Sequence, residues 1–322
     1  STRSWSYVLY KSGDGPFAPG NGTDTALTPS VLTGNGTLVS SRNLFRSTHV
    51  GALFRLFSSG QTVTANLSAA NTFTDAIRVV GVDAARILNY AITGTWVGTL
   101  TFQRSFDSES SGFADVTSFT ANASGTSDDS LDNSITWYRF GFKAGNYTSG
   151  TASITLSYAG GSAAGVCRVV GYTSRTAVDI EVLNAFSSLS GTTDWAEGDW
   201  SDRLGWPSTL KFHDGRLFQA GRDKIWGSVS DAYTSYDPDF EGDAGPINRS
   251  VGFGPVDTIN WLLDLSRLIV GREGAETSVR SGSLDEPLTP TNFTLKDCST
   301  QGSAPVSAVK LDTRGVFVQQ SN

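Results

Sequence analysis

The sequence predicts an all-β fold, in which a β-sandwich of the jelly-roll or immunoglobulin type is joined to part of a β-propeller. Three observations predict it. Charged residues make up only 17% of the chain, against about 25% in an average soluble protein. Glycine is abundant, with 35 residues among 322. Short runs of alternating apolar and polar residues lie between Gly, Asn, Asp and Ser, a pattern typical of strands joined by tight turns.

Residues 1–45 are predicted to form an extended arm or linker. The string from Lys11 to Phe17, Lys-Ser-Gly-Asp-Gly-Pro-Phe, is rich in turn-forming residues, and Gly- and Thr-rich stretches with little periodicity follow it. Such composition favours loops over packed elements.

Residues 46–190 are predicted to form the β-sandwich. Alternation with a period of two residues, in short runs bounded by turn signals, is typical of a half-buried sheet in this architecture. The runs are Thr99–Phe106, Ser134–Phe142, Thr151–Tyr158, Val166–Tyr172 and Ala177–Leu183.

Residues 191–322 contain a repeat that predicts propeller-like blades, in an incomplete set. Arg216-Leu217-Phe218 is followed by Gly221, and about fifty residues later Arg267-Leu268-Ile269 is followed by Gly271. The string from Arg314 to Val318 resembles the start of a third copy. A period near fifty residues with paired strands in each copy is typical of propeller blades.

The charge balance argues against a protein that grips nucleic acid or spans a membrane. Lys and Arg number 24 against 31 Asp and Glu, a net charge of −7, so no basic surplus exists to neutralise phosphates. The longest apolar stretch, Trp261–Val270, is interrupted by Asp264 and Arg267. Since neither an initiator Met nor a signal peptide is present, we expect a segment of a longer or processed protein.

Residues suited to catalysis or metal binding are few. His49 and His213 are the only histidines, so a Cys/His zinc site cannot be assembled. His213 precedes Asp214-Gly215, a hairpin-turn signal, and is interpreted as a turn-flanking residue rather than a base. Cys167 and Cys298 are expected to be free and buried. We therefore expect no catalytic residue, cofactor or metal.

Two acidic segments contain residue types that could form a site. The segment from Asp237 to Gly242 partly matches a calcium loop, but Pro238 interrupts it and Asn248 stands where a bidentate Glu is required, so we interpret it as a solvated acidic loop. Asp285 and Glu286 are adjacent, and neighbours on a strand point to opposite faces, so they cannot serve as a glycosidase pair.

Three tryptophans around the connector allow two interpretations. Trp195, Trp200 and Trp206 could stack on sugar rings, which would make the chain a carbohydrate-binding module for host-surface glycans. Alternatively they pack between domains, which the usual burial of Trp favours. Both interpretations stay open, with Trp195 and Trp200 as the candidate stacking residues.

The ordered motifs from Trp206 to Gln319 resemble the blade region of phage tail nozzle proteins of the tail tubular protein B type. Gly15 and Pro16 resemble the segment that precedes this blade in the same family. The residues that carry the resemblance are Gly15, Pro16, Trp206, Pro207, Arg216, Leu217, Gly221, Trp226, Ser228, Arg267, Gly271, Glu276, Pro290 and Gly302.

The resemblance implies a structural virion protein made in the bacterial cytoplasm. It implies a homo-hexamer that contacts the tail adaptor and other tail proteins, and a conduit through which double-stranded DNA passes without specific binding. The sandwich would be an insertion to which no motif assigns a role. The family offers no catalytic residues to carry over. An acidic lumen would suit this function, because like charge removes the attraction for phosphates.

Overall fold

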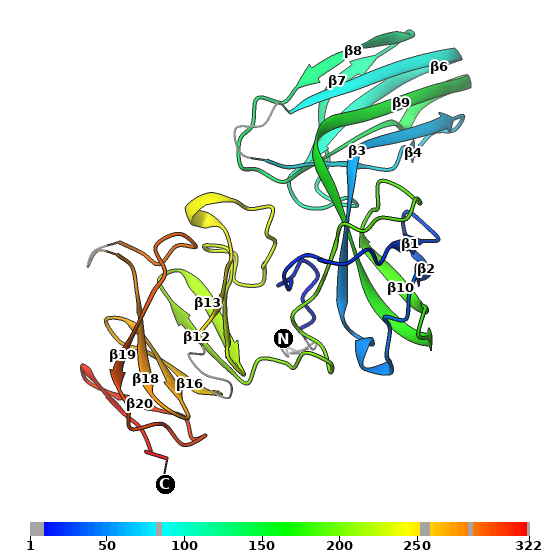
Figure 1. The fold of residues 1–322 in the computed structure, drawn as a ribbon. Helices are drawn as coiled ribbons and strands as arrows, with labels where there is room; N and C mark the ends of the chain where they lie inside the picture. The colour runs from blue at the N-terminus through cyan, green and yellow to red at the C-terminus, as the bar shows by residue number, and fades with distance from the viewer. Residues whose placement is uncertain (1–9, 82–85, 252–257, 283–285, 321–322) are drawn as a thin grey trace, which may run out of the picture. The chain divides into compact units, whose positions relative to one another are not determined.

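The fold of this chain was taken from a computed structural model, which describes residues 10–81, 86–251, 258–282 and 286–320. In these ranges the protein consists of β-strands and two short 3-10 helices, with no α-helix. The predicted all-β class is therefore confirmed (Figure 1). No helix in the described ranges has the length and apolarity needed to span a membrane.

The chain divides into two compact units. One, the sandwich unit, contains Ala18–Glu197 together with Asp239–Glu241. The other, the blade unit, contains Ser1–Phe17, Gly198–Pro238 and Gly242–Asn322. The sandwich unit is thus inserted within the sequence of the blade unit.

An 11-stranded antiparallel sheet forms the sandwich unit. Its long strands β3, β6 and β9 span much of the unit, and β9 pairs along its length with both β3 and β6 (Figure 1). The elements are β1 Leu27–Pro29, β2 Asn35–Ser40, η1 Ser47–His49, β3 Leu53–Leu67, β4 Thr72–Phe73, β5 Ile77–Val79, β6 Ile87–Ser105, β7 Ala114–Phe119, β8 Ala123–Asp128, β9 Thr136–Ser174, β10 Ala177–Asn184 and β11 Trp195–Glu197.

This sheet encloses two apolar cores. The first is built around Phe102, Phe140 and Phe142, where the first part of β9 pairs with β6. The second is built around Phe54 and Val169, where the last part of β9 pairs with β3 and β10. The sandwich character of this unit therefore comes from one curled sheet that continues through both cores.

The predicted arm of residues 1–45 is wrong as a single segment. Strands β1 and β2 join the sandwich sheet, because β2 pairs with β10, and Leu27 and Leu38 are fully buried in its second core. Within the described residues, the segment 10–17 belongs instead to the blade unit. The boundary at 190 also shifts, since β11 pairs with β3 and remains in the sandwich unit.

The blade unit contains two consecutive four-stranded antiparallel sheets and a two-stranded hairpin. Blade one is β12 Thr209–His213, β13 Arg216–Gly221, β14 Lys224–Gly227 and β15 Ile247–Ser250, with η2 Gly242–Ala244 before β15. Blade two is β16 Ile259–Asp264, β17 Leu268–Arg272, β18 Glu276–Arg280 and β19 Thr294–Ser299. The hairpin is β20 Val309–Leu311 and β21 Arg314–Val316.

The repeat seen in the sequence corresponds to these sheets. In each blade the strands follow one another in sheet order, as in a propeller blade. The turn between β12 and β13 has positive φ angles at Asp214 (45°) and Gly215 (68°), the conformation that Asp-Gly favours in a two-residue hairpin. Phe218 of blade one and Val270 of blade two share one apolar core.

Candidate functional site

The motif residue Arg216 holds together the end of blade one. Its guanidinium is buried and donates hydrogen bonds to the carbonyl oxygens of Ser228 (2.6 Å), Gly245 (2.6 Å) and Leu288 (3.2 Å). Burial lowers the pKa of Arg216. The Ser228 hydroxyl accepts the Leu217 amide (3.0 Å). These three motif residues therefore serve the blade structure.

The motif glycines lie where a side chain would collide with its surroundings. A Cβ at Gly221 would stand 2.8 Å from the carbonyl oxygen of Trp206 and 3.1 Å from the Cα of Pro207. The motif residues Gly221, Trp206 and Pro207 therefore lie against one another. A Cβ at Gly271 would stand 2.0 Å from the Trp261 ring. Gly302 has a φ of 74°, and a Cβ there would stand 2.0 Å from the carbonyl oxygen of Glu273.

Asp199, which the sequence did not single out, binds the motif residue Trp226. The buried Asp199 carboxylate accepts hydrogen bonds from Lys224 Nζ (2.6 Å), Trp226 Nε1 (3.0 Å) and Asn248 Nδ2 (2.8 Å). Its amide donates to the carbonyl of Pro16 (2.9 Å). Asp199 therefore joins the Gly15-Pro16 segment to blade one, and both belong to one unit.

The remaining motif residues also have structural contacts. Glu276 is buried, and its Oε1 accepts a hydrogen bond from Ser303 (2.6 Å). The Pro290 carbonyl accepts one from Arg249 (2.5 Å). Gly15 has a φ of 133°, and a Cβ there would stand 2.7 Å from a backbone oxygen. The motif therefore does not outline a common cleft.

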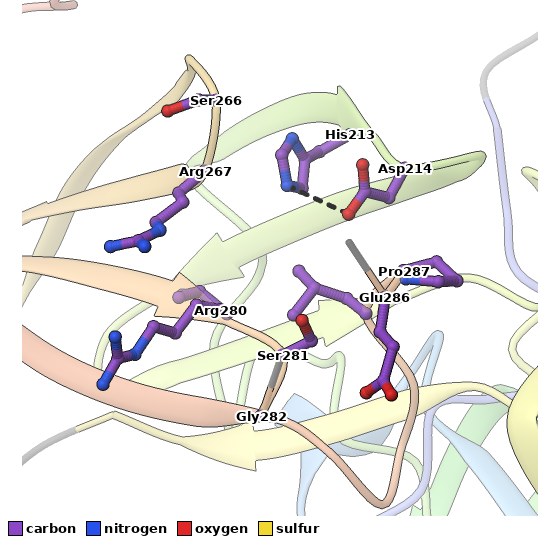
Figure 2. A pocket seen from close by; sticks show the side chains of 11 residues that line it. His213, Asp214, Ser266, Arg267, Arg280, Ser281, Gly282, Glu286 and Pro287 are labelled. Carbon is purple, nitrogen blue, oxygen red and sulfur yellow. Dashed lines mark ion pairs between the residues drawn. The ribbon is translucent and has the colours of Figure 1, made fainter. Parts of the chain in front are cut away.

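Arg267 is the exception among the motif arginines. It aligns with Arg216 in the repeat, yet it is only partly buried and lines an open hollow of about 480 Å³ in the blade unit. Figure 2 shows its side chain together with that of Arg280. Arg267 immediately precedes β17 and Arg280 ends β18, next to the paired residues Leu268 and Val279. The hollow is also lined by His213, Asp214, Ser266, Val279, Ser281, Gly282, Glu286, Pro287 and Leu288.

His213 is fixed between two carboxylates at the edge of this hollow. Its Nδ1 lies 2.6 Å from Asp264 Oδ1. Its Nε2 lies 3.4 Å from Asp214 Oδ2, the contact drawn as a dashed line in Figure 2. The first contact joins blade one to blade two. Since both ring nitrogens face carboxylates, the geometry is that of an inter-blade hydrogen bond rather than of a base poised beside a nucleophile.

The hollow offers limited chemistry. Its two guanidinium groups could bind a carboxylate, but Glu286 and Asp214 line it with the opposite charge. In the described part of the chain, no group of three or more His, Cys, Asp or Glu side chains could hold a metal ion. Asp285, considered above with Glu286 as a carboxylate pair, lies outside the described residues.

Two tryptophans proposed for sugar stacking are buried. Trp195 packs against Phe54, and its Nε1 donates to the carbonyl of Thr25 (2.8 Å). Trp200 packs edge-on against Trp226 and Tyr236. The stacking assignment of Trp195 and Trp200 is therefore wrong, because neither ring face is open to a ligand. Each packs inside its own unit. Trp206 remains 51% exposed, with its Nε1 bound to Asp202 (2.7 Å).

The prediction of a solvated acidic loop holds for Glu241 and Gly242, which are exposed, but is wrong for the two aspartates. Asp237 is buried, and the Asp239 carboxylate is paired with the guanidinium groups of Arg55 and Arg78 inside the sandwich unit. Burial alone would raise the pKa of Asp239, but the charges of Arg78 and Arg55 outweigh it and hold this pKa below its usual value.

The other histidine and the cysteines have structural surroundings. His49 is buried against Phe45 and Phe54, and its Nδ1 accepts the Arg46 amide (2.8 Å). Both cysteines are free. Cys167 is buried, as expected, and burial raises its thiol pKa, whereas the expectation of a buried Cys298 is wrong because this residue is exposed.

No protein-family model matches this chain, and a search of curated proteins finds no relative.

Proposed function

We propose that this chain is a structural component of the tail nozzle of a short-tailed phage or prophage. It would form part of the conduit for genome exit and an assembly surface for the tail adaptor and other tail proteins, as a homo-hexamer in the virion. The chain would be made in the bacterial cytoplasm, would not be an enzyme, and would need no cofactor.

The observation that carries this proposal is which segments of the chain make up the blade unit. The Gly15-Pro16 segment and the motifs after Trp206 lie 190 residues apart in sequence, yet they fold into one unit with two successive four-stranded blades. The intervening sandwich is an insertion. The resemblance likewise treats the sandwich as an insertion and the Gly15-Pro16 segment as the one that precedes the blade, and contacts such as that of Asp199 with Pro16 support this.

The roles of the motif residues support a structural function. Two of them form hydrogen bonds inside the blade unit, namely Arg216 and Glu276. Two others leave room for close packing in their own blade, namely Gly221 and Gly271. Such residues maintain a scaffold, whereas the motif of an enzyme family converges on a reacting centre. The net charge of −7 also suits a wall past which DNA moves without adhering.

The proposal can be tested on purified virions. Electron microscopy with an antibody against the sandwich unit should label a six-fold tube at the distal end of the tail, and mass spectrometry should detect the chain in stoichiometric amounts. Absence of the chain from intact virions would refute the proposal. So would a protein that stays monomeric when mixed with its tail adaptor.

Carbohydrate binding is a second candidate function, favoured now by a single observation, the exposed indole of Trp206. If host-surface glycans bind there, Trp206→Ala should abolish retention on immobilised host lipopolysaccharide. Trp195→Ala should act only through lost stability. Equal retention of wild type and Trp206→Ala would exclude this site.

A further inference from the structure

A separate hollow in the sandwich unit, called here the sandwich hollow, is lined by two arginines. It has a volume of about 380 Å³. One wall is the segment 43–47, which leads into η1, and the other is the turn between β9 and β10. Among the described residues that line it, none carries a carboxylate, although the net charge of the chain is −7. Its polar lining residues are Asn43, Arg46, Ser47, Tyr172 and Arg175.

The two walls of the sandwich hollow are held together by the backbone. The carbonyl oxygen of Arg175 accepts hydrogen bonds from the amides of Leu44 (2.8 Å) and Phe45 (2.9 Å). Phe45 also lines the hollow, and its ring is buried against Phe54 in the second core of the sheet. The hollow therefore keeps its shape without help from its polar side chains, which are left available for a ligand.

Arg46 and Arg175 differ from the other arginines of the sandwich unit. Among the described residues, neither guanidinium has an ion-pair partner or lies over an aromatic ring. Two like charges on one hollow repel each other, and a bound anion would remove that repulsion. Each of the other arginines has such a partner: Arg42 has Asp24, Arg55 and Arg78 have Asp239, Arg86 has Asp129, Arg168 has Glu181, Arg104 has Phe106, and Arg139 has Phe73 and Phe113.

The side chains around the arginines are those that bind a sugar. Planar guanidinium groups bind phosphate and carboxylate groups through paired hydrogen bonds. Tyr172 is 40% exposed and offers both a ring and a hydroxyl group. The side chains of Asn43 and Ser47 are exposed, and neither forms a hydrogen bond with another described residue. Amide and hydroxyl groups beside an aromatic ring match the hydroxyl groups and the apolar face of a pyranose.

We propose that the sandwich hollow binds an acidic sugar. Arg46 and Arg175 hold its phosphate or carboxylate group, and Tyr172 contacts its ring. The inference gives a ligand to the sandwich unit, to which no sequence motif assigns a role. It depends neither on the proposed nozzle, which rests on the blade unit, nor on Trp206, which belongs to that other unit.

Ligand-observed NMR titration of the full chain at low ionic strength tests the proposal. The probes are glucose 6-phosphate, glucuronate, glucose and inorganic phosphate. At least one of the two acidic sugars should bind with a dissociation constant of about 1 mM, and the tighter of the two identifies the preferred acidic group. Glucose should not bind measurably. Inorganic phosphate should bind about threefold to tenfold more weakly than the better acidic sugar, because it has no ring for Tyr172.

Four variants assign the contacts. Arg46→Gln and Arg175→Gln should each weaken binding of the acidic sugar at least about tenfold, because each loses a charge-assisted hydrogen bond. Both side chains are exposed, so the melting temperature should stay nearly unchanged. Arg42→Gln is the matched control, since Arg42 is exposed, pairs with Asp24 and does not line the hollow. Tyr172→Ser should weaken binding of the sugar and leave that of inorganic phosphate unchanged.

Three results would overturn the inference. Failure of both acidic sugars to bind at about 20 mM shows that the hollow does not take this class of ligand. An equal loss of affinity in Arg42→Gln and in the two hollow variants shows a general attraction between charges rather than a site. Inorganic phosphate that binds as tightly as glucose 6-phosphate, with no effect of Tyr172→Ser, shows that the sugar ring is not recognised.

Discussion

Replacement of Asp199 by alanine should destabilise the blade unit more than any single surface change. The substitution removes a buried carboxylate that accepts hydrogen bonds from Lys224 Nζ and Trp226 Nε1. It also removes one of two acceptors of Asn248 Nδ2, which keeps the carbonyl oxygen of Phe17 (2.9 Å). Removing one partner of a buried ion pair costs about 3–5 kcal/mol. Asn at this position keeps one acceptor oxygen but loses the charge, so Asp199→Asn should cost about 1–3 kcal/mol.

Urea unfolding and hydrogen exchange together measure this effect. Because two compact units can unfold separately, a single transition cannot be assumed. Amide exchange should accelerate in β14 and β15, which carry the three donors, and stay unchanged in the sandwich strands. The fluorescence transition of Trp200 and Trp226 should move to lower urea with an unchanged slope.

Asp194→Asn, a change of the same chemistry at an exposed position nearby, is the matched control. A double-mutant cycle with Lys224→Met isolates the charge pair, since Met retains most of the apolar stem. The structural role of Asp199 would be refuted if Asp199→Ala lowered the free energy of unfolding by less than about 1 kcal/mol, or by no more than the control does.

Three further predictions concern other contacts. Because Arg78 and Arg55 lower the pKa of Asp239, its contribution to stability is present above its unfolded-state pKa and is lost as pH falls through the lower folded-state value. The melting temperature of the sandwich unit should therefore drop steeply below about pH 4 in wild type and more weakly in Asp239→Asn. Gly271→Ala should destabilise blade two by about 1–3 kcal/mol in urea, against a negligible effect of Gly282→Ala, where a Cβ meets open space. A thiol reagent should modify Cys298 in the native protein, and Cys167 only after unfolding.

Local patterns in the sequence were sufficient to predict the strands of the blades. The Asp-Gly turn of blade one and the Arg-apolar strand signal are short-range features, and the Arg-apolar signal recurs at the interval of the two four-stranded sheets. The prediction of an arm is wrong because Asn35–Ser40 contains small polar residues, and its strand joins the large sheet by pairing with β10, far along the chain. No local signal marks such a partner.

The candidate site shows the same limit at the level of single residues. Arg216 and Arg267 occupy equivalent repeat positions, yet one is buried among carbonyl oxygens and the other lines the hollow. Their difference arises from the segments that follow β14 and β18, which the repeat does not include. Likewise Asp199 and Asp239 resemble ordinary connector acids until their distant partners are placed beside them.

The ends of the inserted segment have a consequence for how such chains diversify. Ala18 donates a hydrogen bond to Glu197 (2.8 Å), and in the other unit Phe17 and Gly198 form an isolated bridge. The polypeptide therefore leaves and re-enters the blade unit at neighbouring points. A short turn could close that gap at little entropic cost. Recombination could exchange the whole sandwich for another module, provided that the replacement also accommodates the Asp239 segment.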